Sequence, residues 1–511
     1  MLHGAEEAWA QAPVAVGPEF RVNTYTTEMQ RFPGIAMDDD GDFVIVWDSK
    51  DQDGDDYGIF GQRFDASGVS QGDEFKVNTF TNGSQRVTPE VIDAVSMDGS
   101  GNFVIVWDSR QDGGSLFDQS GVYAQRFNFA GEPIGNEFRV NSRTTGSQRG
   151  SAVAMDDEGN FVVAWRDNVG DDFGSDIFAQ IFDLGGNRVG SEFRVNNRTE
   201  GDQFHPSVDM NSIGEFVISW NGPGRNLGDD IYARKFDNKG APVGSEFVVD
   251  IFSTDGIERF PTVAISNEGS FVIAWGNGLD GSGTGIFAAC FDSSGEPIFG
   301  PQGYEFLVNT WTTRSQFAPS AAMDQDGDFV IAWESFDFYG AGQDGSGSGI
   351  FAQRYDSDCS PVGSEFQVNT STQDQQSRPS VAIDADGDFA VTWISFEGGA
   401  AKYDVYAQRY AASSVANEDE ATLPAALTLD PVFPNPVRDA ATLRYALPTP
   451  VAVRLSVTDV LGRTVLTRAE GVQPAGEHEA RLALDDLPSG VYVVRLDANG
   501  ATATQRVTVV R

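Results

Sequence analysis

A phrase that ends in tryptophan recurs along the chain and constrains its fold more than any other feature. Each copy is a short apolar run such as FVIVW, and successive copies lie 55 to 60 residues apart. The seven tryptophans are Trp47, Trp107, Trp165, Trp220, Trp275, Trp333 and Trp393. A period of this length is typical of a propeller or a solenoid, with four short strands in each copy. Because the runs are apolar on both strand faces, each sheet is expected to be covered on both sides by its neighbours.

A second recurring element indicates that the repeats close into a ring. The phrase EF-x-V, expected to be the fourth strand, also occurs seven times, but its first copy precedes the first tryptophan. The last repeat ends with the strand at 404–410 and lacks a fourth strand of its own. The opening strand therefore completes the last blade, which removes two sheet edges. We predict an all-β fold in which residues 19–410 form a seven-bladed β-propeller.

The first strand of each repeat is predicted to line the axis, because it carries a small residue where an innermost strand is crowded. Examples are Ala36, Ser96 and Ala382, and the exception is Asp209. The phrases DGDFVIVW, GIFAQRYD and GSEFQVNT resemble a repeat of secreted and surface-exposed bacterial proteins, whose ligands are mostly unassigned. That resemblance implies an extracellular setting and adds little chemistry.

The charge and the hydropathy of the chain argue against several classes of binding partner and against a membrane anchor. The net charge of −42 argues against nucleic acid and anionic membranes, which attract basic surfaces. This acidic, lysine-poor composition is typical of proteins from salt-loving organisms. No apolar run approaches the roughly 18 to 20 residues that span a bilayer, so we expect no transmembrane anchor. Cys290 and Cys359 lie at unlike positions of different repeats, so a disulfide framework is not expected to hold the fold together.

The composition changes after Tyr410. Residues 411–429 are polar and linker-like, and residues 430–511 contain alternating strand patterns such as AVRLSVTDVLGRTV and GVYVVRLDA. About eighty residues of short antiparallel strands predict a small immunoglobulin-like β-sandwich. The alternative is an ordinary accessory sandwich.

Several ordered motifs give this second domain a close resemblance. PNPVRDAATLRYALP, VTDVLGRTV, LPSGVYVVRL and the final VTVVR resemble the type A C-terminal sorting domain of the Por (type IX) secretion pathway. The resemblance implies recognition of residues 430–511 by the type IX machinery and delivery outside the cell, or to the outer surface, of a Gram-negative bacterium. Residues 1–18 lack the basic and apolar regions of a signal peptide, so we interpret them as an export remnant or an extension.

Aspartate-rich turns are candidate metal ligands. The pattern D-x-D-G-D supplies three carboxylates in three of the repeats, whereas calcium takes six to eight oxygens. The nine candidates are Asp38, Asp40, Asp42, Asp324, Asp326, Asp328, Asp384, Asp386 and Asp388. The alternative is a plain hairpin turn, since repeats with NSIGE or SNEGS are also expected to turn there. We expect no required cofactor, with calcium as the one candidate.

Catalytic signals are sparse. The propeller contains one histidine, His205, and the chain has no G-x-S-x-G, P-loop or C-x-x-C motif. The candidate acid/base pair is His205 with Asp209, whose pKa would rise if it faced a narrow channel. A glutamine also recurs before the inner strands and is replaced by Glu258 in one repeat, a pattern that favours a structural role.

These observations favour a secreted or cell-surface binding or adhesion protein that is not an enzyme. Its ligand, a glycan or a protein, is expected on the face that carries the long loops after the tryptophan strands. One alternative is an extracellular polysaccharide hydrolase or lyase that uses acids in the propeller funnel. Another is a structural adhesin whose acidic surface is adapted to salt.

Overall fold

The computed structural model divides the chain into two compact units, residues 1–414 and 415–511. The residues described are 13–87, 93–111, 120–168, 174–225, 228–251, 258–278, 283–301, 303–337, 342–345, 347–373, 375–396, 402–411, 427–429, 432, 435–438, 440–447, 451–473, 476–484, 487–498 and 501–510. Every regular element among them is a β-strand. Each unit is described by itself below.

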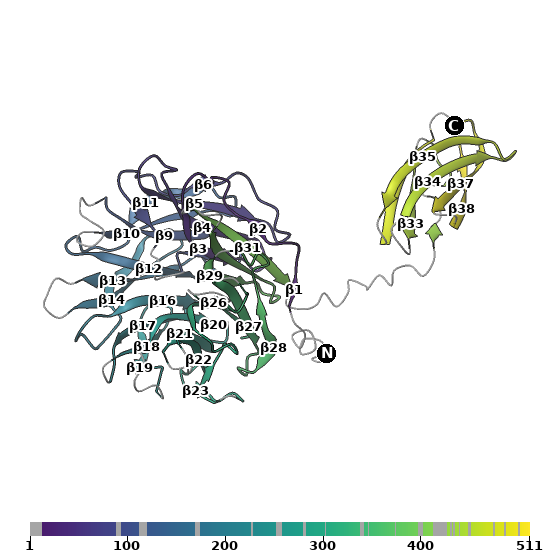
Figure 1. Cartoon of the computed structure of the whole chain (residues 1–511). Helices are drawn as coiled ribbons and strands as arrows, with labels where there is room; N and C mark the ends of the chain where they lie inside the picture. The colour runs from purple at the N-terminus through teal and green to yellow at the C-terminus, as the bar shows by residue number, and fades with distance from the viewer. Residues whose placement is uncertain are drawn as a thin grey trace. The chain divides into compact units, whose positions relative to one another are not determined.

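The first unit contains seven antiparallel sheets, which we call blades 1 to 7 (Figure 1). Blade 1 is β3 (Gln30–Met37), β4 (Phe43–Lys50), β5 (Tyr57–Phe64) and β6 (Phe75–Lys76). Blade 2 is β7 (Gln85–Arg86), β8 (Val95–Met97), β9 (Phe103–Ser109), β10 (Gly121–Phe127) and β11 (Pro133–Arg139). Blade 3 is β12 (Gln148–Met155), β13 (Phe161–Asn168), β14 (Ser175–Phe182) and β15 (Arg188–Arg194). Blade 4 is β16 (Phe204–Met210), β17 (Phe216–Pro223), β18 (Asp229–Phe236) and β19 (Pro242–Val248).

The remaining blades follow the same order. Blade 5 is β20 (Arg259–Ile265), β21 (Phe271–Asn277), β22 (Gly285–Phe291), β23 (Pro297–Ile298) and β24 (Glu305–Leu307). Blade 6 is β25 (Ser315–Met323), β26 (Phe329–Phe336), β27 (Gly349–Tyr355) and β28 (Pro361–Gln367). Blade 7 is β29 (Gln376–Ile383), β30 (Phe389–Phe396) and β31 (Tyr403–Ala411), joined by β1 (Val14–Ala15) and β2 (Phe20–Arg21).

The innermost strands form a closed circle. In the order β3, β8, β12, β16, β20, β25 and β29 each contacts the next, and β29 contacts β3. A cluster of buried apolar side chains lies between each blade and the next. The recurrent tryptophans lie in the second strands and are at most 1% exposed. Each second strand is thus covered on both faces, as its continuous apolar run predicts.

The chain closes the ring as predicted, by pairing its first strands with the last blade. Phe20 is opposite Ala407, and the Val22 amide donates to the Val405 carbonyl at 2.8 Å. The contact begins earlier than the predicted boundary at residue 19, because Val14 is opposite Ala411. The outer edge of β31 is long enough to pair with both β1 and β2. The rest of the predicted extension, residues 1–12, lies outside the described residues.

The cysteines correct the expectation drawn from their positions. Cys290 on β22 and Cys359 in the turn after β27 form a disulfide that joins blades 5 and 6. Cys290 lies in the third strand of its blade, whereas Cys359 lies in the outer turn after the third strand of the next. The two blades stack with an offset, so the third strand of blade 5 lies beside the outer turn of blade 6. Disulfides persist in oxidising compartments, so the bridge suits a protein that leaves the cytoplasm.

The second unit is a two-sheet β-sandwich. One sheet contains β32 (Thr428–Leu429), β33 (Ala440–Leu447) and β36 (Gly476–Ala483), and the other contains β34 (Val451–Asp459), β35 (Thr464–Gln473), β37 (Gly490–Ala498) and β38 (Ala501–Val509). Buried side chains from both sheets, including Leu443, Leu455 and Leu496, form its core. The DVLGR phrase forms the β34–β35 hairpin turn, where Asp459 Oδ1 accepts from the amides of Leu461 and Arg463.

Removing the disulfide is expected to destabilise the propeller without unfolding it. The bridge closes a segment of 69 residues, and such a cross-link contributes about 2–4 kcal/mol by restricting the unfolded chain. Replacing Cys290 and Cys359 by alanine should lower the free energy of unfolding by that amount in a guanidinium titration. Equal stability of the variant and the oxidised wild type would show that the bridge does not form.

Candidate functional site

A cavity of about 210 Å³ lies on the propeller axis and is lined by inner strands of all seven blades. Its wall combines apolar residues such as Ile35 and Val263 with the carboxyl groups of Asp93 and Asp209. The ends of the inner strands add the acids Asp39 and Asp157. The axial cavity is therefore acidic, and Asp209 lies on the axis as predicted.

Asp209 connects two neighbouring inner strands. Its Oδ1 accepts from its neighbour Met210, and its Oδ2 accepts from the amide of Ile265 in blade 5, both at 2.9 Å. Inner strands of adjacent blades do not pair as a sheet, so amides that face the next blade need side-chain acceptors. The Ser207 hydroxyl oxygen accepts from the amide of Val263 in the same way. Burial, with a smaller contribution from the Asp93 carboxylate, raises the pKa of Asp209 to about 7.

Asp93 is an acid of the axial cavity that sequence reasoning missed. Its Oδ2 accepts from the Ser207 hydroxyl at 2.6 Å, so it links blade 2 to blade 4. Burial raises the pKa of Asp93 to about 6. The residue precedes β8 by two positions and does not occupy the small-residue position, so comparison of the repeats gave no signal for it.

His205 has partners other than Asp209. Its Nδ1 lies 2.7 Å from Asn221 Oδ1, and its ring lies 4.6 Å from that of Phe260 on blade 5. Asp209, by contrast, bonds to Met210 and Ile265. The side chains of the proposed acid/base pair therefore have different hydrogen-bond partners, and the structure does not join them.

A bulge near the start of the inner strands places unusual residues at the end of these strands opposite the aspartate turns. In five blades a non-glycine residue there has a positive φ, at a position two residues after the recurrent glutamine or Glu258. They are Phe32 (52°), His205 (50°), Phe260 (55°), Ala318 (49°) and Arg378 (59°). Residues with side chains are strained in this region, and such strain collects at binding and catalytic sites. We call this end of the inner strands the mouth. Each inner strand begins beside the end of the antiparallel second strand, so the mouth lies on the side of the long loops.

The bulge residues of neighbouring blades contact one another. The Arg378 guanidinium lies 5.8 Å from the centre of the Phe32 ring, and that of Arg31 lies 4.8 Å from it. His205 and Phe260 form the second contact. These side chains are all partly exposed. We call Phe32, His205, Phe260 and Arg378 the mouth group.

The nine aspartates of the D-x-D-G-D turns lie at the opposite end of the inner strands. Asp38 Oδ1 accepts from the amides of Asp40 and Asp42, and Asp324 and Asp384 make the same pair of bonds. Asp98 does so in a turn without the three acids. These bonds build the hairpin. Within the described ranges, these nine residues do not form a group of three with oxygens within 4.8 Å of one another, and calcium binding there stays a prediction.

The recurrent glutamine makes contacts inside the ring. Gln30 Oε1 accepts from the Trp47 indole at 3.0 Å, and Gln148 Oε1 accepts from Asn141 at the end of the preceding blade at 2.9 Å. The Nε2 groups of the same two residues donate to the backbone carbonyls of Glu28 and Thr145. The role of the recurrent glutamine is structural.

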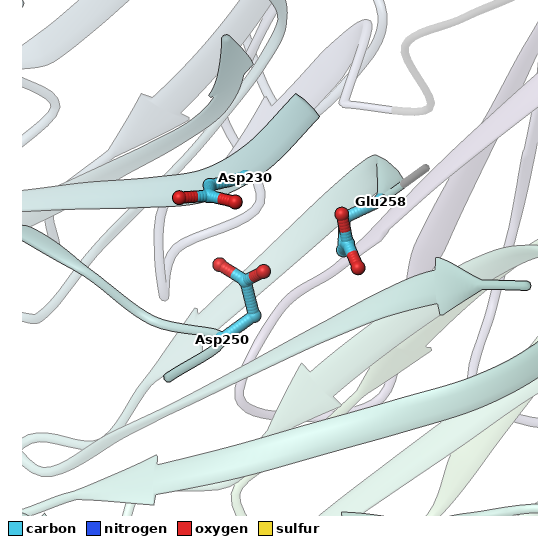
Figure 2. Close-up of side chains that lie close together, drawn as sticks. All are labelled: Asp230, Asp250 and Glu258. Atoms are coloured by element: carbon cyan, nitrogen blue, oxygen red, sulfur yellow. The ribbon is translucent and has the colours of Figure 1, made fainter. Parts of the chain in front are cut away.

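Three carboxyl groups meet where the glutamine is replaced. Asp230, Asp250 and Glu258 turn toward a common space, and an oxygen from each lies within 4.8 Å of the others (Figure 2). Their exposed fractions are 6%, 0% and 2%. Sequence reasoning noted Glu258 alone. The signal for Asp250 was available, because the other repeats have asparagine at its position in VN.

The comparisons with known proteins identify the second unit. Residues 431–510 match the model of the secretion system C-terminal sorting domain. This part of the chain is a type IX sorting domain. The protein is therefore secreted to the cell surface or the extracellular space, by way of the type IX machinery. No helix among the described residues is long and apolar enough to cross a membrane.

Three solved structures are similar to part of this chain. A protein of unknown function from Dyadobacter fermentans is 10% identical with a TM-score of 0.44, covering 78% of this chain and 98% of its own. The GH93 α-L-arabinofuranosidase of Fusarium graminearum is 10% identical with a TM-score of 0.41, covering 78% and 97%. The β-propeller domain of the trilobed protease of Pyrococcus furiosus is 10% identical with a TM-score of 0.39, covering 75% and 94%. No curated protein matches the sequence.

Asp209 should make stability depend on pH. Because its folded pKa lies near 7 and its unfolded pKa near 3.8, the folded chain keeps a proton that the unfolded chain loses. The free energy of unfolding should therefore fall as the pH rises from about 4 to about 7. Asp209→Asn should remove part of this fall and be more stable than the wild type at pH 8, by about 2 kcal/mol. Parallel pH curves for the variant and the wild type, measured by urea unfolding, would contradict this assignment.

Proposed function

We propose that the propeller is an extracellular binding module that takes a glycan at the mouth on the loop-rich face. The mouth group carries this proposal. It places two phenylalanines and a histidine, all partly exposed, on strained backbone that the ring holds in place. Aromatic rings provide rigid apolar surface at little cost in entropy, which suits the apolar faces of sugar rings.

The charge of the protein narrows the ligand further. A net charge of −42 repels polyanions, so a neutral glycan fits the molecule better than an anionic one. Asn221 is buried and holds the His205 ring through the contact between its Oδ1 and Nδ1, so the histidine is fixed beside the Phe260 ring. Secretion brings the propeller to the compartment where such polymers occur.

Loss of the aromatic surface tests this function. The full chain, screened on a glycan array, is expected to bind neutral glycans, and Phe32→Ala with Phe260→Ala should weaken binding at least about tenfold. Phe129→Ala is the matched control, since Phe129 is 67% exposed on an outer turn of blade 2. A protein ligand in place of a glycan, or an equal effect of the control, would overturn the proposal.

A hydrolase or lyase is the second candidate, and Asp93 with Asp209 favours it. The pKa values of these axial carboxyl groups, about 6 and about 7, suit a general acid. Their hydrogen bonds to Ser207, Met210 and Ile265 also have a structural explanation, so we rank this function below binding. If it operates, the full chain releases reducing ends from a polysaccharide, and Asp93→Asn with Asp209→Asn abolishes the release. Absence of cleavage across neutral and acidic polysaccharides removes this candidate.

A further inference from the structure

Four of the connections between blades share an amide pair. The asparagine at the end of a fourth strand accepts the amide of the adjacent third strand, as Asn78 Oδ1 does from Ile59 at 2.7 Å. Its Nδ2 then donates to the recurrent glutamine. The pairs are Asn78 with Gln85, Asn141 with Gln148, Asn309 with Gln316, and Asn369 with Gln376. Asparagine thus supplies both the acceptor and the donor that the connection needs.

The connection from blade 4 to blade 5 lacks both amides. Asp250 replaces the asparagine, and its Oδ1 still accepts from the Ile231 amide at 2.8 Å. Glu258 replaces the glutamine. Since a carboxylate donates no hydrogen bond, the amide pair of those four connections cannot form here.

A third carboxyl group, that of Asp230, lies beside these two and lacks the donor that the corresponding aspartate has in blade 3. An aspartate occurs at its position in blade 3 too, but there Asn196 Nδ2 donates to Asp176 Oδ1 at 2.7 Å. In blade 4 the corresponding side chain is Asp250, which offers an oxygen in place of that donor. Figure 2 shows the three carboxyl groups turned toward a common space.

A cation contacts one of the three groups: the Arg225 Nε lies 2.9 Å from Asp230 Oδ2. Three buried carboxyl groups with oxygens this close repel one another when they are ionised. Buried negative charge is costly unless a positive group compensates it.

One oxygen in the cluster has no partner. Asp250 is fully buried, and its Oδ2 makes no hydrogen bond among the described residues. Its Oδ1 is occupied by Ile231, so Oδ2 is the atom left for a ligand in the common space. A buried polar atom without a partner is rare in native proteins and calls for an explanation, such as a bound ion.

We propose that Asp230, Asp250 and Glu258 bind a divalent cation, calcium being the best fit. Carboxylate oxygens are hard ligands, which calcium and magnesium prefer over softer donors. Calcium lies about 2.4 Å from its ligands, so two of its oxygens are at most about 4.8 Å apart. The three side chains meet this limit. The ion supplies the positive charge that replaces the amide pair, and it joins blade 4 to the strand that begins blade 5.

The decisive comparison restores the two amides. Asp250→Asn with Glu258→Gln returns the asparagine and the glutamine of the connections that also carry an aspartate. In those connections Asn196 donates to Asp176 and Asn23 donates to Asp404. The new asparagine should donate to Asp230 in the same way, so this variant is expected to fold. Glu200→Gln with Glu268→Gln is the control, because it removes the same charge from two exposed positions. Each full chain is freed of metal with EDTA, and its melting temperature is measured with and without 10 mM calcium chloride or magnesium chloride.

The wild type and the control should gain about 2–6 °C in calcium, and the restored variant should gain less than a third of that. Calorimetric titration with calcium should show one site in the wild type that the restored variant lacks. Equal calcium shifts in all three proteins would overturn the proposal. So would a wild type that calcium does not stabilise, since the cluster would then be neutralised by a proton.

Discussion

The propeller depends on the requirement that every sheet be covered on both faces. Its second strands are apolar on both sides and carry tryptophans that are almost fully buried. One blade alone cannot meet this requirement, but neighbouring blades meet it for one another in a closed ring. The seven apolar clusters between blades, and the pairing of β1 and β2 with β31, follow from this constraint.

The same ring creates the polar features of the axis. Inner strands of adjacent blades contact one another without sheet pairing, so their outward amides bond to side chains such as Ser207 and Asp209. The bulge at the start of these strands has a related effect, since it aims residues such as Phe32 and Phe260 toward the loop-rich mouth. The acidic axial cavity and the mouth group are therefore both consequences of closing the ring.

The sequence predicted the elements that repeat. Seven copies of the tryptophan strand and of the fourth strand were enough for the propeller, its closure and the position of Asp209 on the axis. Ordered motifs were enough for the sorting domain. Repeated elements could be predicted because each copy lies in the same physical environment within the ring.

Features that depend on one place in the ring were not predictable in this way. The Cys290–Cys359 bridge depends on the offset between two stacked blades. The separation of His205 from Asp209 depends on the bulge that rotates the strand between them. The carboxyl cluster combines single substitutions in β18, after β19 and before β20, and its three positions come together only in the folded ring.

Hydrogen exchange at the closure tests the ring most directly. The Val22 amide bonds to the Val405 carbonyl, and the Val405 amide bonds to Asn23 Oδ1. In the intact chain, the peptides that contain residues 13–23 and 403–411 should exchange as slowly as the peptide of β17, which is buried in the middle of blade 4. Rapid exchange of both closing peptides, with β17 still protected, would contradict a closed propeller.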